Sequence, residues 1–263
     1  MTRFHELFPT PRPLIGMIAL PPLPGYAAFT TIGALVEAAL ADLAALEGGG
    51  VSGVLVENDF DQPHTLVGGA EIVAAMTRVT SEVVQHARVP VGVEVLLNDW
   101  RASLAVAASA GARFIRLDFF VDRVRSKLGI IEPQPQSILE FRRHIQAEHV
   151  QIYADLQVKY SSMADGPKPI ARSAREAAAA GADAVIVTGT ETGVGPEVTD
   201  LTDARAGGLP VLIGSGLSPD NAANLVAHAD GFIVGTSMRS GRTATDRVVR
   251  GQVEALTRAI ASA

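Results

Sequence analysis

Four stretches of the chain repeat one pattern of hydrophobic and polar positions. Each has an alanine-rich helical tail, a break at small residues, and a β-prone apolar run that ends in polar residues. The stretches are LEGGGVSGVLVEN (46–58), ASAGARFIRLDFF (108–120), AAAGADAVIVTGT (178–190) and LVAHADGFIVGT (225–236). Glycine at the break suits the left-handed cap of a helix. The apolar runs do not alternate with polar residues, which indicates strands buried on both faces of a parallel sheet.

Extending this pattern along the chain predicts eight strands with helices between them. The expected strands cover 14–18, 53–57, 91–96, 113–118, 151–158, 183–188, 210–214 and 230–235. The expected helices cover 33–47, 68–87, 100–109, 136–147, 170–180, 197–206, 219–227 and 244–262. Ser218-Pro219 predicts a helix start, because serine caps a helix and proline suits its first position.

Eight strand–helix units predict one (β/α)₈ barrel, or TIM barrel, as a single domain over residues 1–263. Residues 1–12 are expected to form a short N-terminal extension. An open doubly wound sheet is the main alternative, but the chain lacks the GxGxxG turn after its first strand that marks that fold.

The composition narrows the classes of function. Of the 263 residues, 48% are hydrophobic, and the formal net charge is −6. Without clustered basic residues we expect no nucleic acid partner. The absence of cysteine excludes disulfides, thiolate catalysis and cysteine-bound metals. Because we find neither a signal peptide nor a stretch of about 18 apolar residues, we expect a cytoplasmic protein without stable membrane insertion.

Polar side chains follow the expected strands two to five, where a (β/α)₈ barrel carries its catalytic and binding groups. The candidates for a catalytic role are Glu94, Asp99, Asp118, Asp155 and Lys159. The candidates for substrate binding in this region are Glu57, Asn98 and Arg116. Residues two apart on a strand share a face, which groups Arg116 with Asp118 and groups Asp155 with Gln157 and Lys159.

Lys159 has several possible roles among these acids. It can act as an electrostatic clamp or, if its neighbours lower its pKa, as a base or Schiff-base nucleophile, with Asp118 or Asp155 as the general acid/base partner. The structural alternative is a plug in which Lys159 pairs with Asp155 or Asp118 merely to seal the barrel. The acids at the ends of strands two to five also make Mg²⁺ a candidate cofactor, although no sequence spacing of ligands supports it.

Two glycine-bearing turns follow the expected strands seven and eight. They are Gly214-Ser215-Gly216 and Gly235-Thr236-Ser237. Many (β/α)₈ enzymes bind phosphate in these two loops, so the turns predict a phosphate site, to which Arg239 could add charge. Thr188 and Thr190, after strand six, are further candidates for substrate binding. The alternative is ordinary turn chemistry, since glycine and serine are common in turns. His64, near the expected mouth, is interpreted as a loop residue.

Several segments resemble the BtpA family, which also includes SgcQ-type proteins. They are IGMIALPPLPG (15–25), GVEVLLNDWRASLAVAASAGARFIR (92–116), ADAVIVTGTETG (182–193), IGSGLSPDN (213–221) and ADGFIVGTSM (229–238). The resemblance implies a (β/α)₈ barrel, and the family name comes from a role in photosystem I biogenesis. The last two segments are also similar to the phosphate sites of ribulose-phosphate-binding barrels such as the tryptophan synthase α subunit.

The chain departs from the family pattern at three positions. Ala19 stands where the family usually has histidine, and Glu94 and Leu97 stand where it commonly has asparagine and arginine. If the family histidine is an acid/base group, this chain lacks it, and a changed substrate is an open alternative.

Two functions follow from these patterns. The first is an enzyme that binds a small phosphorylated metabolite and moves protons in isomerisation, epimerisation or aldol cleavage. The second, which the resemblance to the BtpA family implies, is a non-catalytic assembly factor for a membrane complex such as a photosystem. A homo-oligomer is an expectation from the fold alone.

Overall fold

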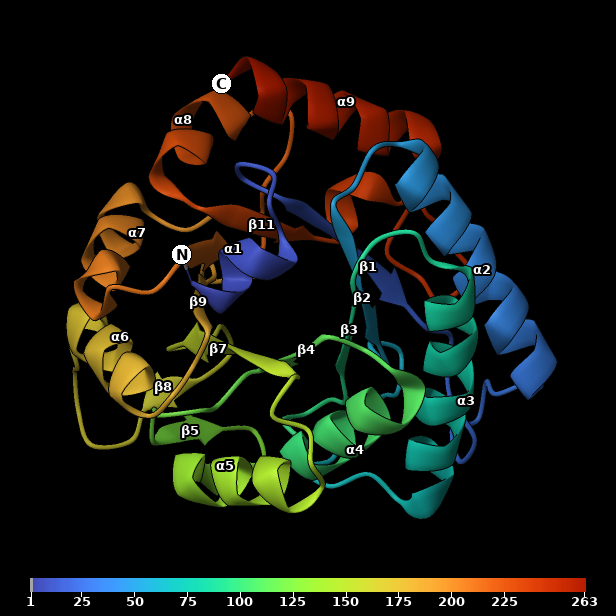
Figure 1. Cartoon of the computed structure of the whole chain (residues 1–263), viewed down its shortest axis with the longest axis horizontal. Coiled ribbons are helices and arrows are strands. Elements are labelled where there is room, and N and C mark those ends of the chain that lie inside the picture. Colours follow the sequence, from blue (N-terminus) through green and yellow to red (C-terminus); the bar gives the residue numbers. More distant parts are fainter. Residues whose placement is uncertain (1) are drawn as a thin grey trace.

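The computed structural model describes residues 2–263, and its main strands close into an eight-stranded parallel barrel (Figure 1). In chain order the barrel strands are β1 (Leu14–Ala19), β2 (Gly53–Glu57), β3 (Val91–Glu94), β4 (Phe114–Leu117), β7 (Gln151–Leu156), β9 (Ala184–Val187), β10 (Val211–Ile213) and β11 (Gly231–Val234). The last strand pairs with the first, with Leu14 opposite Phe232. The predicted single-domain (β/α)₈ barrel is therefore confirmed.

Helices surround the barrel and cover the outward faces of its strands (Figure 1). They are α2 (Ile32–Gly48), α3 (Ala70–His86), α4 (Trp100–Ala110), α5 (Pro135–His144), α6 (Ile170–Ala179), α7 (Val198–Ala204), α8 (Ala222–Leu225) and α9 (Arg250–Ser262), with short 3₁₀ turns η1 (Arg205–Gly207), η2 (Val226–His228) and η3 (Thr236–Met238). On α3, Ile72, Met76, Val79 and Val83 are buried at helical spacing, which directs one apolar stripe at the sheet. Within residues 2–263, no helix is both long and apolar enough to cross a membrane.

The N-terminal segment closes one end of the barrel. Helix α1 (Arg3–Leu7) lies over the centre of the ring of strands (Figure 1), and Phe4 and Phe8 are almost fully buried. Phe4 meets the ring of Tyr153 edge-on at 5.7 Å, and Phe8 meets Phe114 at 6.0 Å. The expected extension at 1–12 thus contributes to the interior, and the polar residues of the barrel lie at its other end.

A small antiparallel sheet lies in the loops that follow β4 and β7. Its strands are β5 (Val124–Ser126), β6 (Gly129–Ile131) and β8 (Ser162–Met163). Phe119, Val124, Ile131 and Val158 form a separate apolar cluster beneath it. These strands were not predicted from the sequence, because each is too short to show a periodic pattern.

Several predicted boundaries are wrong, and local contacts explain three of them. Ser218-Pro219 does not start a helix: the amide of Ser218 bonds to Oδ1 of Asn221 at 2.9 Å, and this turn delays α8 until Ala222. The last helix starts at Arg250 instead of 244, because Asp246 accepts bonds from the amide and hydroxyl of Thr243 and holds a turn there.

The predicted strand 151–158 is also too long. β7 ends at Leu156, and Gln157 adopts a left-handed backbone conformation with φ of 48°. The expected alternation from Asp155 through Gln157 to Lys159 therefore breaks, and the side chain of Gln157 turns away to bond to the carbonyl of Lys168 at 2.9 Å.

Candidate active site

A cavity of about 820 Å³ lies at the C-terminal ends of the barrel strands. This volume is within the range of cavities that bind small molecules. Most of the predicted site residues line it: Glu57, Glu94, Arg116, Asp118, Lys159, Gly214, Ser215, Gly216, Gly235, Thr236 and Ser237. We call Glu57, Glu94 and Asp118 the acid wall, and residues 214–216 with 235–237 the glycine wall.

Arg116 and Asp155 form the main buried ion pair beside the acid wall. Nε and Nη2 of Arg116 donate to the two carboxylate oxygens of Asp155 at 2.8 and 3.0 Å. Burial opposes the charge of Arg116, but Asp155 and Glu94 outweigh it and raise the pKa of the guanidinium, which stays a cation. Asp155 is 1% exposed and does not line the cavity. The structural alternative of a plug named Lys159 as the partner of Asp155 or Asp118, whereas the partner of Asp155 is Arg116.

Glu57 and Glu94 lie side by side in the acid wall, because they are register partners on β2 and β3. Burial, and next the charge of Asp59, raises the pKa of Glu57 to about 7. Burial likewise raises the pKa of Glu94 well above its usual value, and the attraction of Arg116 only partly offsets this. Two such neighbours in a dry site favour sharing a proton over carrying two charges.

Asp118 is the third member of the acid wall, one residue beyond the end of β4. Burial, and next the charge of Asp155, raises its pKa to about 6, while Arg116 and Lys159 pull it down. A carboxyl group with a pKa near neutrality can both accept and donate a proton at physiological pH. Lys159 lines the same cavity from the loop after β7.

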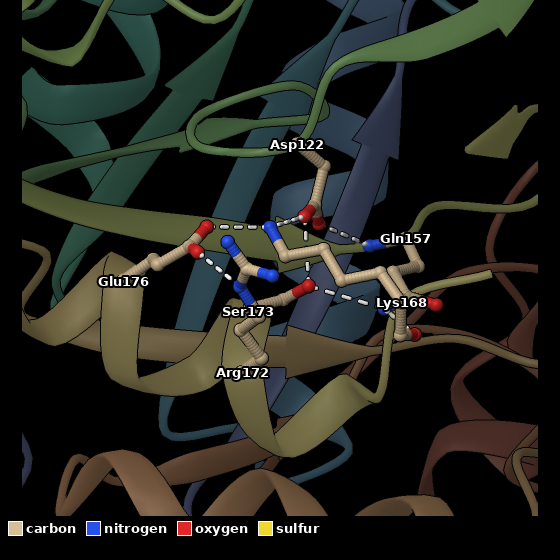
Figure 2. A network of polar contacts seen from close by, with 6 residues as sticks. All are labelled: Asp122, Gln157, Lys168, Arg172, Ser173 and Glu176. Atoms are coloured by element: carbon tan, nitrogen blue, oxygen red, sulfur yellow. Dashed lines mark hydrogen bonds and ion pairs between the residues drawn. The ribbon is translucent and has the colours of Figure 1, made fainter. Parts of the chain in front are cut away.

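A polar network fixes the loop that carries Lys159 (Figure 2). Asp122, in the loop after β4, accepts bonds from Nζ of Lys168 at 2.6 Å, from Oγ of Ser173 at 2.7 Å and from the amide of Gln157 at 3.0 Å. These bonds join the loops after β4 and β7 to the start of α6. Lys159 thus projects from a loop that is held on both sides.

The glycine wall brings main chain close to the cavity. Gly216 has φ of 74°, and a Cβ atom there would lie 2.0 Å from the carbonyl carbon of Val194. Gly235 has more room, since its nearest neighbour would be Sδ of Met17 at 3.2 Å. Oγ of Ser237 donates to the carbonyl of Leu217 at 2.8 Å, which ties the two loops together. Glycine at 216 is therefore needed for packing, whereas at 235 it leaves space toward the cavity.

The further side chains that line the cavity include those of Arg239, Arg242 and His64. Arg239 is 7% exposed and bonds to the carbonyl of Asp246, yet its Nε and Nη1 have no hydrogen-bond partner among the described residues. Burial lowers the pKa of His64, which favours a neutral imidazole. Arg242 and His64 were not predicted as site residues, because neither lies at a strand end.

Besides Asp155, four predicted site residues lie outside the cavity lining. Asp99 caps α4, accepting from the amides of Ala102 at 3.0 Å and Gly68 at 2.8 Å. Asn98 bonds through its side chain to both backbone groups of Phe119. The remaining two are Thr188, which accepts a 3.4 Å bond from the amide of Lys159, and Thr190, which is exposed.

The acid wall does not have the arrangement of a Mg²⁺ centre. Within residues 2–263, no three acidic or histidine side chains come together as a metal-binding group. Asp155 is already bonded to Arg116 through both of its oxygens. We therefore derive no chemical step through a metal.

Comparison with known proteins identifies relatives across the whole chain. The family model described as the BtpA family matches residues 10–262. Photosystem I biogenesis protein BtpA of Synechocystis sp. (strain ATCC 27184 / PCC 6803 / Kazusa) is 35% identical over 238 residues, which are 89% of this chain and 83% of that protein. An uncharacterized protein of Pyrococcus horikoshii is 34% identical over 232 residues, 88% of each chain. An uncharacterized mitochondrial protein of Caenorhabditis elegans is 32% identical over 246 residues, 90% of this chain and 88% of that protein.

Several solved structures are similar at low sequence identity. N-(5′-phosphoribosyl)anthranilate isomerase from Pyrococcus furiosus has a TM-score of 0.57 at 12% identity, over 96% of this chain and 100% of that chain. Thiamine phosphate pyrophosphorylase from Pyrococcus furiosus has a TM-score of 0.60 at 15% identity, over 95% and 96%. A tryptophan synthase chain from M. tuberculosis has a TM-score of 0.61 at 18% identity, over 99% and 100%. These similarities show the shared barrel fold.

Proposed function

The chain belongs to the BtpA family, and from this premise we propose that it is an enzyme that moves a proton within a small phosphorylated metabolite. The reaction is of the isomerase, epimerase or aldolase type. One observation carries the proposal: Asp118, a carboxyl group whose pKa burial raises to about 6, lines the same cavity as the two glycine turns after β10 and β11.

In this proposal the two walls have different roles, phosphate binding and proton transfer. The glycine wall binds the phosphate through main chain and hydroxyl groups, as the corresponding loops do in many (β/α)₈ enzymes. Holding this non-reacting group orients the rest of the metabolite across the cavity. Asp118 then takes a proton from carbon as a carboxylate and returns it as a carboxylic acid. Lys159, whose positive charge acts on Asp118, stabilises negative charge that develops on a neighbouring oxygen.

The structural neighbours support the choice of a phosphorylated ligand. Two of them are named for phosphorylated compounds, N-(5′-phosphoribosyl)anthranilate isomerase and thiamine phosphate pyrophosphorylase. The first is also an isomerase by name. This support comes from a shared fold, so the ligand and the reaction need direct tests on this chain.

Thermal unfolding in the presence of inorganic phosphate and a panel of sugar phosphates tests the phosphate site. A ligand at about 100 times its Kd should stabilise the protein by about 2.7 kcal/mol, which is a rise in Tm of about 5–10 °C. Gly235→Asp should abolish the shift, because it places a carboxylate beside the phosphate without a backbone clash. Gly235→Ala is the matched control for bulk. If no phosphorylated compound shifts the Tm, the proposal fails.

Proton exchange with solvent tests the role of Asp118. A compound that shifts the Tm should lose a C–H signal in the proton NMR spectrum when incubated with the protein in D₂O. Asp118→Asn should slow this loss by about 100-fold or more, the effect typical of a general acid/base group, while the Tm shift by the ligand remains. Equal exchange rates in both proteins would remove Asp118 from the mechanism.

The second candidate function is non-catalytic assembly of a membrane complex. The relative named Photosystem I biogenesis protein BtpA favours it. Leu128, Ile130 and Val194 are also 44%, 42% and 47% exposed on loops at the cavity end of the barrel. This function predicts a stoichiometric membrane partner in a pull-down from lysate, and binding of that partner by Asp118→Asn as well as by the unchanged protein.

A further inference from the structure

Three buried carboxylate oxygens of the acid wall lack protein partners. Oε2 of Glu57 and both side-chain oxygens of Glu94 have no hydrogen-bond partner among residues 2–263. The two side chains are 5% and 1% exposed, and both line the cavity. Most buried polar atoms in proteins are hydrogen-bonded, so three orphaned oxygens at one spot call for a ligand group that donates.

The protein's own cation does not serve these oxygens. Arg116 directs Nε and Nη2 at Asp155, and its Nε lies 3.7 Å from Oε2 of Glu94, too far for a hydrogen bond. Lys159 forms no ion pair with either glutamate within the described part of the chain. A proton shared between Glu57 and Glu94 satisfies only part of this set of oxygens. The remaining hydrogen-bond donors must therefore come from the cavity side.

The charges around these oxygens favour a cation. Glu57, Glu94, Asp118 and Asp155 are four carboxyl groups around one buried guanidinium, that of Arg116. Burial raises the pKa values of Glu57 and Glu94, and a neighbouring carboxylate adds to each rise, Asp59 for Glu57 and Glu57 for Glu94, so the unliganded wall holds protons that a bound cation would displace. A neutral donor would leave this excess of acid groups in place.

We propose that Glu57 and Glu94 bind a protonated amino group of the ligand, so that the substrate is a phosphorylated amine. An ammonium group offers three donors to the three orphaned oxygens and adds the positive charge that the wall lacks. A hydroxyl group offers one donor and no charge. The inference rests on the proposed function, because it places the amine opposite the phosphate held by the glycine wall.

Matched pairs of ligands separate the amine from the phosphate. The probes are glucosamine 6-phosphate against glucose 6-phosphate, and 3-aminopropyl phosphate against 3-hydroxypropyl phosphate. Within each pair the phosphate is constant, and one amino group replaces one hydroxyl. Isothermal titration calorimetry at pH 7.5 should give an affinity at least about tenfold higher for at least one amine over its hydroxyl partner, the effect of a charge-assisted bond. Equal affinities within both pairs would overturn the proposal.

Substitutions in the acid wall test whether it causes the higher affinity for the amine. Glu94→Gln keeps the size of the side chain, removes its charge, and should reduce the preference for the amine to less than about threefold, with the affinity of the hydroxyl partner unchanged. Glu57→Gln should have the same direction of effect. Glu254→Gln, on the exposed face of α9, is the matched control and should leave both affinities unchanged. A preference that survives in both cavity variants would also overturn the proposal.

The number of protons released on binding is a further test, because a ligand that only packs against the acid wall would not change it. Binding of the amine at pH 7 should release protons from Glu57 and Glu94, measured as a dependence of the binding enthalpy on the ionisation enthalpy of the buffer. The hydroxyl partner should release fewer protons, and Glu57→Gln should lower the release. Equal release by both partners would contradict ammonium binding.

A last comparison distinguishes failure of this inference from failure of the proposed function. If no phosphorylated probe binds, the phosphate site is wrong, and glucosamine against glucose then tests the acid wall without phosphate. A preference for glucosamine that Glu94→Gln removes would support the ammonium site alone. Equal affinities for phosphorylated amine and hydroxyl probes would support the phosphate site alone.

Discussion

The two walls of the cavity achieve polarity in opposite ways. The acid wall consists of charged side chains that project from β2 and β3 and from just beyond β4. The glycine wall, after β10 and β11, consists of main chain exposed by glycine and tied by bonds such as that from Ser237 to the carbonyl of Leu217. The side chains titrate and depend on one another, whereas the main-chain groups keep their charge distribution at every pH.

Because of this difference, we expect each wall to select a different feature of the ligand. The glycine wall is suited to one constant group such as phosphate, because its shape follows from backbone packing. The acid wall responds to charge, because the pKa values of Glu57 and Asp118 lie near neutrality. We therefore expect substitutions in the acid wall to change stability and pH dependence, and substitutions in the glycine wall to change ligand binding at all pH values.

The largest expected effect comes from breaking the ion pair beside the acid wall. Arg116→Met leaves the 1% exposed Asp155 without its partner. We expect a loss of about 3–5 kcal/mol in the free energy of unfolding, measured by chemical denaturation. Arg116→Met combined with Asp155→Leu should recover most of that loss, because the carboxylate that Arg116 pairs with is removed as well.

In the glycine wall, Ser237→Ala is the counterpart of this change. It removes one neutral hydrogen bond and should cost only about 0.5–1.5 kcal/mol. Similar costs for the two single substitutions would contradict the contrast between the walls.

The next effect is on the pH dependence of stability. Burial raises the pKa of Glu57 in the folded protein to about 7, with Asp59 and Asp118 adding to the rise and Arg116 and Glu94 opposing it. The folded state therefore binds the proton more tightly than the unfolded chain does. Stability from this group is present below pH 4 and is lost as the pH rises through about 7.

Denaturation at pH 5, 6, 7 and 8, without ligand, measures this loss. Stability should fall by about 2 kcal/mol over the range, and Glu57→Gln should flatten the profile. A profile that Glu57→Gln leaves unchanged would assign the titration to another group.

The smallest expected effect is that of Asp99→Ala, which tests whether Asp99 acts only as a helix cap or also belongs to the site. Asp99→Ala should cost about 1 kcal/mol of stability through the lost cap of α4. Its Tm shift on binding a phosphorylated ligand should equal that of the unchanged protein, because Asp99 does not line the cavity. A smaller Tm shift on ligand binding in Asp99→Ala would show that Asp99 contributes to the site.

The barrel strands were predictable because each is a short apolar run buried on both faces. The closure of the barrel base was not, although Phe4 and Phe8 are spaced by four residues as on one face of a helix. A segment of this length gives no periodic signal of its own, and its helix is stabilised by contact with Tyr153 and Phe114, far away in the chain. The strands β5, β6 and β8 likewise depend on contacts between distant loops.

The positions of the site residues were more predictable than their partners. The sequence placed Arg116 and Asp155 at the same end of the barrel, but the pairing depends on side-chain reach across β4 and β7. The structural alternative had paired Asp155 or Asp118 with Lys159. Asp99 directly precedes α4, so its capping role carried a recognisable signal. Arg242 and His64 lie on loops whose course follows from tertiary packing, and no local pattern places them.

The helix at the base of the barrel also bears on how the chain folds during synthesis. Phe4 and Phe8 leave the ribosome before Phe114 and Tyr153, the rings they pack against, and β1 pairs with β11, which is made much later. β1 therefore lacks one of its neighbouring strands until β11 is made. Until Phe114 and Tyr153 emerge, these aromatic side chains lack the rings they pack against, which makes the nascent chain a candidate client for chaperones that bind exposed aromatic segments.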